Sequence, residues 1–208
     1  YNIGWMILLI ALFIGGVSLW AAIDMPLQVA TSISLGVITS FVLTGGIQQF
    51  FAWKVIYYKL QNNFPLVRFE LKHAFLVGVS ILVLASSILL VIGSQLPLFA
   101  HVDLRLTASY VLLIGVFRLS MIPTYAYRKI SFLFITTLSA LFTLFLTYFT
   151  LLNFGIPRVN AVISAQTTAL LIAIIAATIF AVKLAYSERN HGPRRNDVAT
   201  TYREPTRT

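Results

Sequence analysis

The chain has 208 residues, of which 59% are hydrophobic and only 10% are charged. This composition excludes a soluble globular domain and predicts an integral membrane protein. A formal net charge of +9 would suggest a nucleic-acid partner in a soluble protein, but the basic residues stand between apolar runs and in the tail. We therefore expect no nucleic acid. The chain has no cysteine, which excludes disulfides and thiolate metal sites.

A transmembrane helix needs about 20 mostly apolar residues. Six segments, taken in chain order, meet this requirement: residues 4–22, 27–52, 73–94, 106–126, 130–152 and 161–186. None of them alternates apolar and polar residues as a membrane β-strand does. The predicted fold class is therefore all-α, a polytopic membrane helical bundle of about six transmembrane helices. The basic stretch at residues 54–72 is longer than the other connections, and we expect it to be a linker that forms an interfacial helix.

The distribution of lysine and arginine predicts the orientation of the bundle. With residues 54–72 inside the cell, twelve basic residues fall on the inner side and only Arg105 and Arg158 on the outer side. The positive-inside rule then places both termini in the cytoplasm, and we expect the chain in the cytoplasmic (inner) membrane. Residues 187–208 have almost no large aliphatic side chains, which predicts a disordered, basic cytoplasmic tail after a six-helix transmembrane lobe at residues 1–186.

The sequence offers little for catalysis. None of its six acidic residues lies deep inside a predicted span, so paired carboxylates for acid–base chemistry are not visible. The three histidines have no ligand-like spacing, and no phosphate-binding glycine loop or nucleophile elbow stands out. We therefore predict no catalytic residue, no metal site and no cofactor, and we do not expect an enzyme.

The fourth span carries a permanent charge, Arg118. An arginine at the bilayer centre costs roughly 2.5–3.5 kcal/mol on insertion scales, so we expect it to face a cavity or a buried partner rather than lipid tails. Helical spacing places Thr107, Gly115 and Tyr125 on the same stripe. The alternative is that the arginine snorkels to the interface. Pro123 interrupts the hydrogen-bond ladder of this helix, and we predict a kink there that acts as a hinge.

Polar residues also lie within the second and fifth spans. The second span approaches its inner end with two amides, Gln48 and Gln49. Gln49 shares one stripe with four polar or small residues, namely Gln28, Ser32, Thr39 and Gly46. This stripe is typical of a polar face and equally of close helix packing through small residues, and both readings stay open. A threonine stripe in the fifth span favours packing: Thr136, Thr143, Thr147 and Thr150.

Two stretches resemble a known family of transporters. The corner "LLNFGIPRVNAVISAQTT" at residues 151–168 and the helix "ATSISLGVITSFVLTGGIQQFFAWKVIYYKLQNN" at residues 30–63 are similar to the C-terminal half of polysaccharide and O-antigen flippases. These flippases belong to the multidrug/oligosaccharidyl-lipid/polysaccharide exporter superfamily. The Phe154-Gly155-Ile156 core of the corner is present, whereas Asn153 replaces the family's proline.

The resemblance implies a role for the chain. Members of the family have about twelve helices in two related halves, so this chain would be one lobe, with the N-terminal half of the same transporter as its partner. The expected function is to translocate lipid-linked oligosaccharide or polysaccharide repeat units across the membrane. The resemblance implies a cavity that accepts an undecaprenyl-diphosphate-linked oligosaccharide, with membrane lipids around it. Arg118 would contact the anionic head group, and Gln48, Gln49 and Tyr125 would line the cavity.

Two other functions remain open at this stage. One is a cation-coupled drug exporter of the same superfamily, for which a membrane-embedded acid outside this sequence would be the indication. The other is a non-transporting membrane scaffold subunit, in which Arg118 pairs with a helix of a partner protein.

Overall fold

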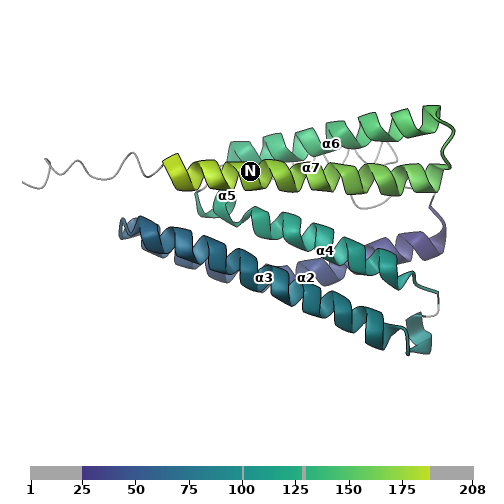
Figure 1. Ribbon diagram of the computed structural model, residues 1–208, viewed down its shortest axis with the longest axis horizontal. Coiled ribbons are helices and arrows are strands. Elements are labelled where there is room, and N and C mark those ends of the chain that lie inside the picture. The colour runs from purple at the N-terminus through teal and green to yellow at the C-terminus, as the bar shows by residue number, and fades with distance from the viewer. Residues whose placement is uncertain (1–24, 100, 128–129, 188–208) are drawn as a thin grey trace, which may run out of the picture.

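The computed structural model describes residues 25–99, 101–127 and 130–187, and these residues form a bundle of helices (Figure 1). The helices are α2 (Leu27–Leu60), α3 (Phe64–Gly93), α4 (Leu104–Ser120), α5 (Ile122–Ala126), α6 (Ile130–Asn153) and α7 (Arg158–Ser187), with one 3₁₀ turn at Pro97–Phe99. No strand occurs among the residues that the structure describes. The predicted all-α fold class is confirmed.

Five segments of the structure are long and apolar enough to cross a membrane. They are Leu27–Leu60, Phe64–Gly93, Leu104–Ala126, Phe134–Asn153 and Arg158–Lys183. These segments correspond to the second to sixth predicted spans. The first predicted span, residues 4–22, lies outside the described residues, as does the predicted tail from residue 188 onward. A sixth span and membership of a larger transporter therefore stay predictions.

The basic stretch at residues 54–72 does not form a separate interfacial helix, so that expectation was wrong. Residues 54–60 continue α2, and α3 begins at Phe64. The reversal takes only three residues: Asn62 adopts a positive φ of 55°, and the side chain of Asn63 caps α3 by accepting a hydrogen bond from the Leu66 amide at 3.4 Å. Both helices thus extend beyond the residues that hydropathy alone assigns to the hydrocarbon core.

Helix α6 ends at a turn that contains a glycine, and α7 follows this turn. Gly155 has a φ of +76°, a left-handed conformation that glycine adopts without steric penalty. Its amide donates to the Leu152 carbonyl at 2.9 Å, and the Ile156 amide donates to the Leu151 carbonyl at 3.2 Å. This is the Schellman pattern of helix termination, and it brings α6 and α7 together as an antiparallel hairpin (Figure 1).

Helix α4 is the central element of the bundle. It packs against α2 and α3 on one side and against α7 on the other, as Figure 1 shows. The largest buried cluster joins α2, α4, α6 and α7 and includes Ile33, Tyr110, Ile114, Leu144, Ala165 and Leu170. Large hydrophobic side chains remain exposed on the outer faces, among them Leu76, Val83, Phe142 and Ile175. An apolar exterior of this kind suits a bilayer and not water.

Glycines let α4 approach its neighbours closely. On α3, Gly78 lies against the side chain of Leu119 of α4, and in return Gly115 of α4 lies against Leu82 of α3. Each leucine therefore fills the space that the opposite glycine leaves. Between α2 and α4 the approach involves the backbone itself, because a Cβ atom at Gly36 would lie 2.8 Å from the Thr107 backbone oxygen. Small residues at interfaces are the usual means by which membrane helices pack.

Apart from Arg118, the described cations lie at the two ends of the bundle. At the end where α2 ends and α3 begins, which we call the basic end, lie Lys54, Lys59, Arg68, Lys72 and Lys183. At the opposite end lie only Arg105 and Arg158, near the starts of α4 and α7. This separation agrees with the charge distribution on which the predicted orientation rests.

Candidate functional site

The central span is interrupted close to the predicted proline. Helix α4 ends at Ser120, and the short helix α5 begins at Ile122. The Met121 amide bonds to the Arg118 carbonyl at 3.2 Å, an i→i−3 contact that tightens the last turn. Pro123 stands in the first turn of α5, where its missing N–H leaves no donor for the carbonyl four residues earlier. The predicted break is present, and a hinge motion there stays a prediction.

Arg118 lies one turn before this break and reaches across to α2. Its Nη1 donates to the Phe41 backbone carbonyl at 3.2 Å, and its Nη2 donates to the side-chain oxygen of Gln48 at 3.1 Å. The guanidinium carbon also lies 4.0 Å from the centre of the Phe41 ring, within cation–π range. The side chain is half-buried. Sequence reasoning named Arg118 and Gln48, and the structure brings these two together.

The other two predicted lining residues lie differently. Gln49 is exposed, because one residue along a helix turns the side chain by about 100° and carries it away from the α2–α4 interface. Tyr125 of α5 is also exposed, at 50% of its surface. It is close enough to Arg118 for an electrostatic interaction between the two side chains. The structure thus places Tyr125 near the arginine and Gln49 on a different face.

No carboxylate pairs with Arg118 among the residues that the structure describes, where Glu70 pairs with Lys54 instead. A guanidinium has five N–H donors, and α2 accepts two hydrogen bonds from this one. Three donors therefore have no acceptor within the described ranges. Such a group is able to bind an anion at its free edge, because its fork of donors matches a phosphate or carboxylate.

Close packing fixes the half of α4 that lies farther from the break. Thr107 shares its hydroxyl proton between the Asp103 carbonyl at 2.9 Å and the Ser32 carbonyl of α2 at 3.1 Å, and the Ser32 hydroxyl accepts from the Asp103 amide at 2.8 Å. On α2 the buried small residues recur every four positions, at Ser32, Gly36, Ser40 and Thr44. Of the stripe predicted through Gln49, Ser32 alone is fully buried. The face of α2 that packs through small residues is thus the one with Gly36, Ser40 and Thr44, and most of the stripe predicted through Gln49 lies outside this contact.

Two buried polar pairs escaped the sequence reasoning. Tyr110 and Gln166 are both fully buried, and the tyrosine hydroxyl donates to the Gln166 side-chain oxygen, which joins α4 to α7. Glu70 is 5% exposed, and its Oε1 accepts from Lys54 Nζ at 3.2 Å. The other carboxylate oxygen, Oε2, is buried with no partner in the described part of the chain. The sequence Asn-Asn-Phe-Pro at residues 62–65 could have predicted the second pair. It starts α3 before Glu70 and therefore places this residue inside the helix.

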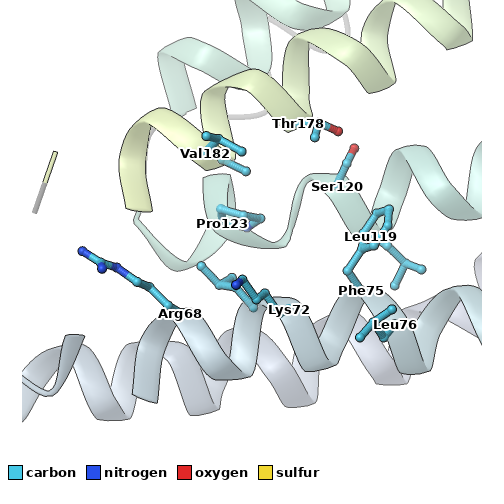
Figure 2. A pocket seen from close by; sticks show the side chains of 11 residues that line it. Arg68, Lys72, Phe75, Leu76, Leu119, Ser120, Pro123, Thr178 and Val182 are labelled. Carbon is cyan, nitrogen blue, oxygen red and sulfur yellow. The ribbon is translucent and has the colours of Figure 1, made fainter. Parts of the chain in front are cut away.

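A cleft of about 620 Å³ opens between α3 and α7, with the broken region of the central span between them (Figure 2). Its lining residues are Arg68, Leu71, Lys72, Phe75, Leu76, Leu119, Ser120, Pro123, Thr178, Ala181 and Val182. We call it the α3–α7 cleft. The predicted hinge residue Pro123 forms part of its wall, whereas Arg118 and Gln48 are not among its lining residues. No group of three or more metal-binding side chains occurs in the segments that the structure describes.

Comparison with known proteins identifies no relative of this chain. The sequence matches no protein-family model, no curated protein and no solved structure. The class of the protein rests on its helices, which define a multi-pass helical membrane protein. The resemblance to flippases therefore stays a prediction from the sequence.

Proposed function

We propose that the chain is one lobe of a membrane transporter that translocates a lipid-linked oligosaccharide, and that Arg118 binds the diphosphate of this substrate. The observation that carries the proposal is a half-buried arginine inside a spanning helix, with donors left over and no carboxylate beside it among the described residues. An intramembrane charge of this kind marks a substrate or ion pathway by default.

The position of Arg118 supports a role in translocation. The segment Leu104–Ala126 has 23 residues, so it is about 34 Å long at 1.5 Å per residue. Arg118 lies about 21 Å from its start and about 12 Å from its end. The charge is thus well inside the hydrocarbon thickness of about 30 Å, at a depth that the head group of a lipid-linked substrate has to pass.

The helix break supports the same proposal. A segment that is interrupted at Met121 has a point at which its two parts are able to change their relative angle. Arg118 lies on α4 and Tyr125 on α5, so the two polar side chains stand on opposite sides of that point. A change of angle there would move one relative to the other while the substrate is bound, as alternating access requires.

The test is a lipid-flipping assay on the purified chain in proteoliposomes, alone and together with its complementary half if the transporter has two. The probe is a fluorescent undecaprenyl-diphosphate oligosaccharide, whose outer-leaflet fraction is read by dithionite quenching. We expect Arg118→Ala to abolish flipping and Arg118→Lys to retain part of it, because lysine keeps the charge without the bidentate fork. Arg105→Ala, at an exposed helix end, serves as the matched control and should leave the rate unchanged.

Each competing function gives a different result in this assay. A drug exporter would move a cationic dye and not the diphosphate probe, and Arg118→Ala would not slow the dye. A scaffold subunit would flip neither probe in any variant. A wild-type rate for Arg118→Ala, at a wild-type level of folded protein, would refute the assignment of Arg118 to the substrate.

A further inference from the structure

The α3–α7 cleft has a charged end and an apolar interior. Arg68 and Lys72 are four residues apart on α3, so they share one helix face. Both lie near the start of α3, at the basic end of the bundle. Figure 2 shows their side chains on the α3 side of the cleft, with Val182 and Thr178 of α7 across from them. No acidic residue occurs among the described residues that line the cleft.

The polar groups in the interior of the cleft do not need hydrogen bonds from a ligand. Its two hydroxyl groups are already satisfied, because Ser120 donates to the Phe117 carbonyl at 2.7 Å and Thr178 donates to the Ile174 carbonyl at 2.8 Å. Leu76, Leu119 and Ala181 are among the apolar residues of the remaining wall. A sugar or a nucleotide would leave its own polar groups unpaired there, which is costly. The interior therefore suits a hydrocarbon chain.

The dimensions agree with a chain-like ligand. The volume of about 620 Å³ lies within the range of ligand-binding pockets. From Arg68 to Leu76 the cleft follows α3 for eight residues, which is about 12 Å along the helix axis. A ligand in this space has its anionic group at the basic end and its apolar part directed toward the middle of the bundle.

From this polarity we infer that the α3–α7 cleft binds an anionic phospholipid of the surrounding bilayer, with its phosphate on Arg68 and Lys72 and one acyl chain along the apolar wall. Basic pockets between membrane helices are known to favour anionic head groups. This lipid is a resident ligand and not the transported substrate, and its site is separate from Arg118. The inference therefore does not depend on the proposed function.

The test measures lipid binding to the purified full-length chain in an uncharged detergent, by native mass spectrometry and by the shift in Tm. Phosphatidylglycerol is compared with phosphatidylcholine of the same acyl chains, and inorganic phosphate is added separately. We expect phosphatidylglycerol to bind more tightly than phosphatidylcholine and inorganic phosphate to give no shift. Each cation near an anionic head group contributes a factor of about five, so Arg68→Gln/Lys72→Gln should weaken phosphatidylglycerol binding about 25-fold and phosphatidylcholine binding much less, because the choline charge offsets that of its phosphate.

Two further variants separate the cleft from general surface charge. Lys183→Gln removes an exposed cation at the same end that does not line the cleft, and its affinity for phosphatidylglycerol should stay within about twofold of wild type, less than the factor of about five expected for each cleft cation. Ala181→Trp fills the apolar wall and should weaken binding of both lipids. Equal binding of the two lipids by the wild-type chain would overturn the inference. So would a loss for Lys183→Gln as large as that for the double variant, or a response to inorganic phosphate alone.

Discussion

The close contact between α2 and α4 predicts that Gly36→Ala destabilises the bundle. A Cβ atom at position 36 would lie 2.8 Å from the Thr107 backbone oxygen and 2.8 Å from the Tyr110 Cβ atom. Ordinary van der Waals contact begins at 3.4 Å, so the two helices would have to separate by about 0.6 Å. Backbone atoms are unable to rotate away as the end of a side chain does. The clash therefore has to be relieved by moving a whole helix.

The magnitude follows from what that movement breaks. The hydrogen bond from the Thr107 hydroxyl to the Ser32 carbonyl is 3.1 Å long, and a further 0.6 Å would stretch it to about 3.7 Å, beyond hydrogen-bonding distance. Overpacking of a well-packed interface costs typically 1–3 kcal/mol, and an interhelical hydrogen bond in a membrane contributes about 0.6 kcal/mol. Alanine recovers up to about 1 kcal/mol through its better helix propensity. We expect a net loss of about 1–3 kcal/mol.

A matched control comes from the same helix. A Cβ atom added at Gly45 would meet no other atom within 4 Å, so Gly45→Ala should leave stability unchanged or raise it by up to about 1 kcal/mol. The assay is reversible unfolding in mixed micelles, followed by circular dichroism as the fraction of denaturing detergent rises. If Gly36→Ala were as stable as Gly45→Ala, the close packing of α2 on α4 would be refuted.

Three further predictions concern the buried pairs and the helix break. Lys54→Met should destabilise the bundle by about 1–3 kcal/mol in the same assay, because Glu70 then stays buried without its cation. Lys54→Met/Glu70→Leu should recover most of that loss, and a double variant no better than the single one would count against the pair. Tyr110→Phe should lower stability by about 0.6–1.5 kcal/mol, since it removes the hydroxyl that donates to Gln166, and an unchanged midpoint would contradict this contact. Pro123→Ala restores a backbone N–H and should slow flipping without lowering stability, whereas a wild-type rate would refute the hinge.

Hydropathy predicted where the spans are but not where the helices end. The hydrocarbon core selects about 20 apolar residues, whereas a helix continues until a turn stops it. Residues 54–60 and 64–72 are too polar for the hydrocarbon core, so they looked like a linker, yet the only interruption between α2 and α3 is the short turn around Asn62. This is why Glu70 was expected in an interfacial linker and instead lies buried inside α3.

Helical spacing predicted which residues share a face but not which helix that face meets. Thr107 and Arg118 lie on one stripe of α4, and both contact α2 as a common face requires. Gly115 is about 60° away from Arg118 around the helix axis, and it packs on Leu82 of α3. When a helix packs between two neighbours, some residues of one stripe contact the first neighbour and the others contact the second. Only the packed bundle determines that division: the sequence predicted that Arg118 and Gln48 share a cavity lining, and the structure shows that the two side chains are hydrogen-bonded.

The energetics of Arg118 support the proposed function, because the charge costs more than its contacts within the bundle return at average values. Placing arginine in the centre of a span costs roughly 2.5–3.5 kcal/mol on insertion scales, whereas leucine gains about 0.5 kcal/mol. The two hydrogen bonds to α2 return about 0.6 kcal/mol each, and at most about 1.7. At the average value the two bonds offset about 1.2 kcal/mol of the penalty, and the cation–π contact with the Phe41 ring adds about 0.5–1 kcal/mol, whereas a leucine at this position would pack against Phe41 without any penalty. An anion that binds the remaining donors would supply the missing free energy, because charge-assisted hydrogen bonds contribute about 1.5–3 kcal/mol each. On the proposed function, the anionic substrate is what explains the arginine.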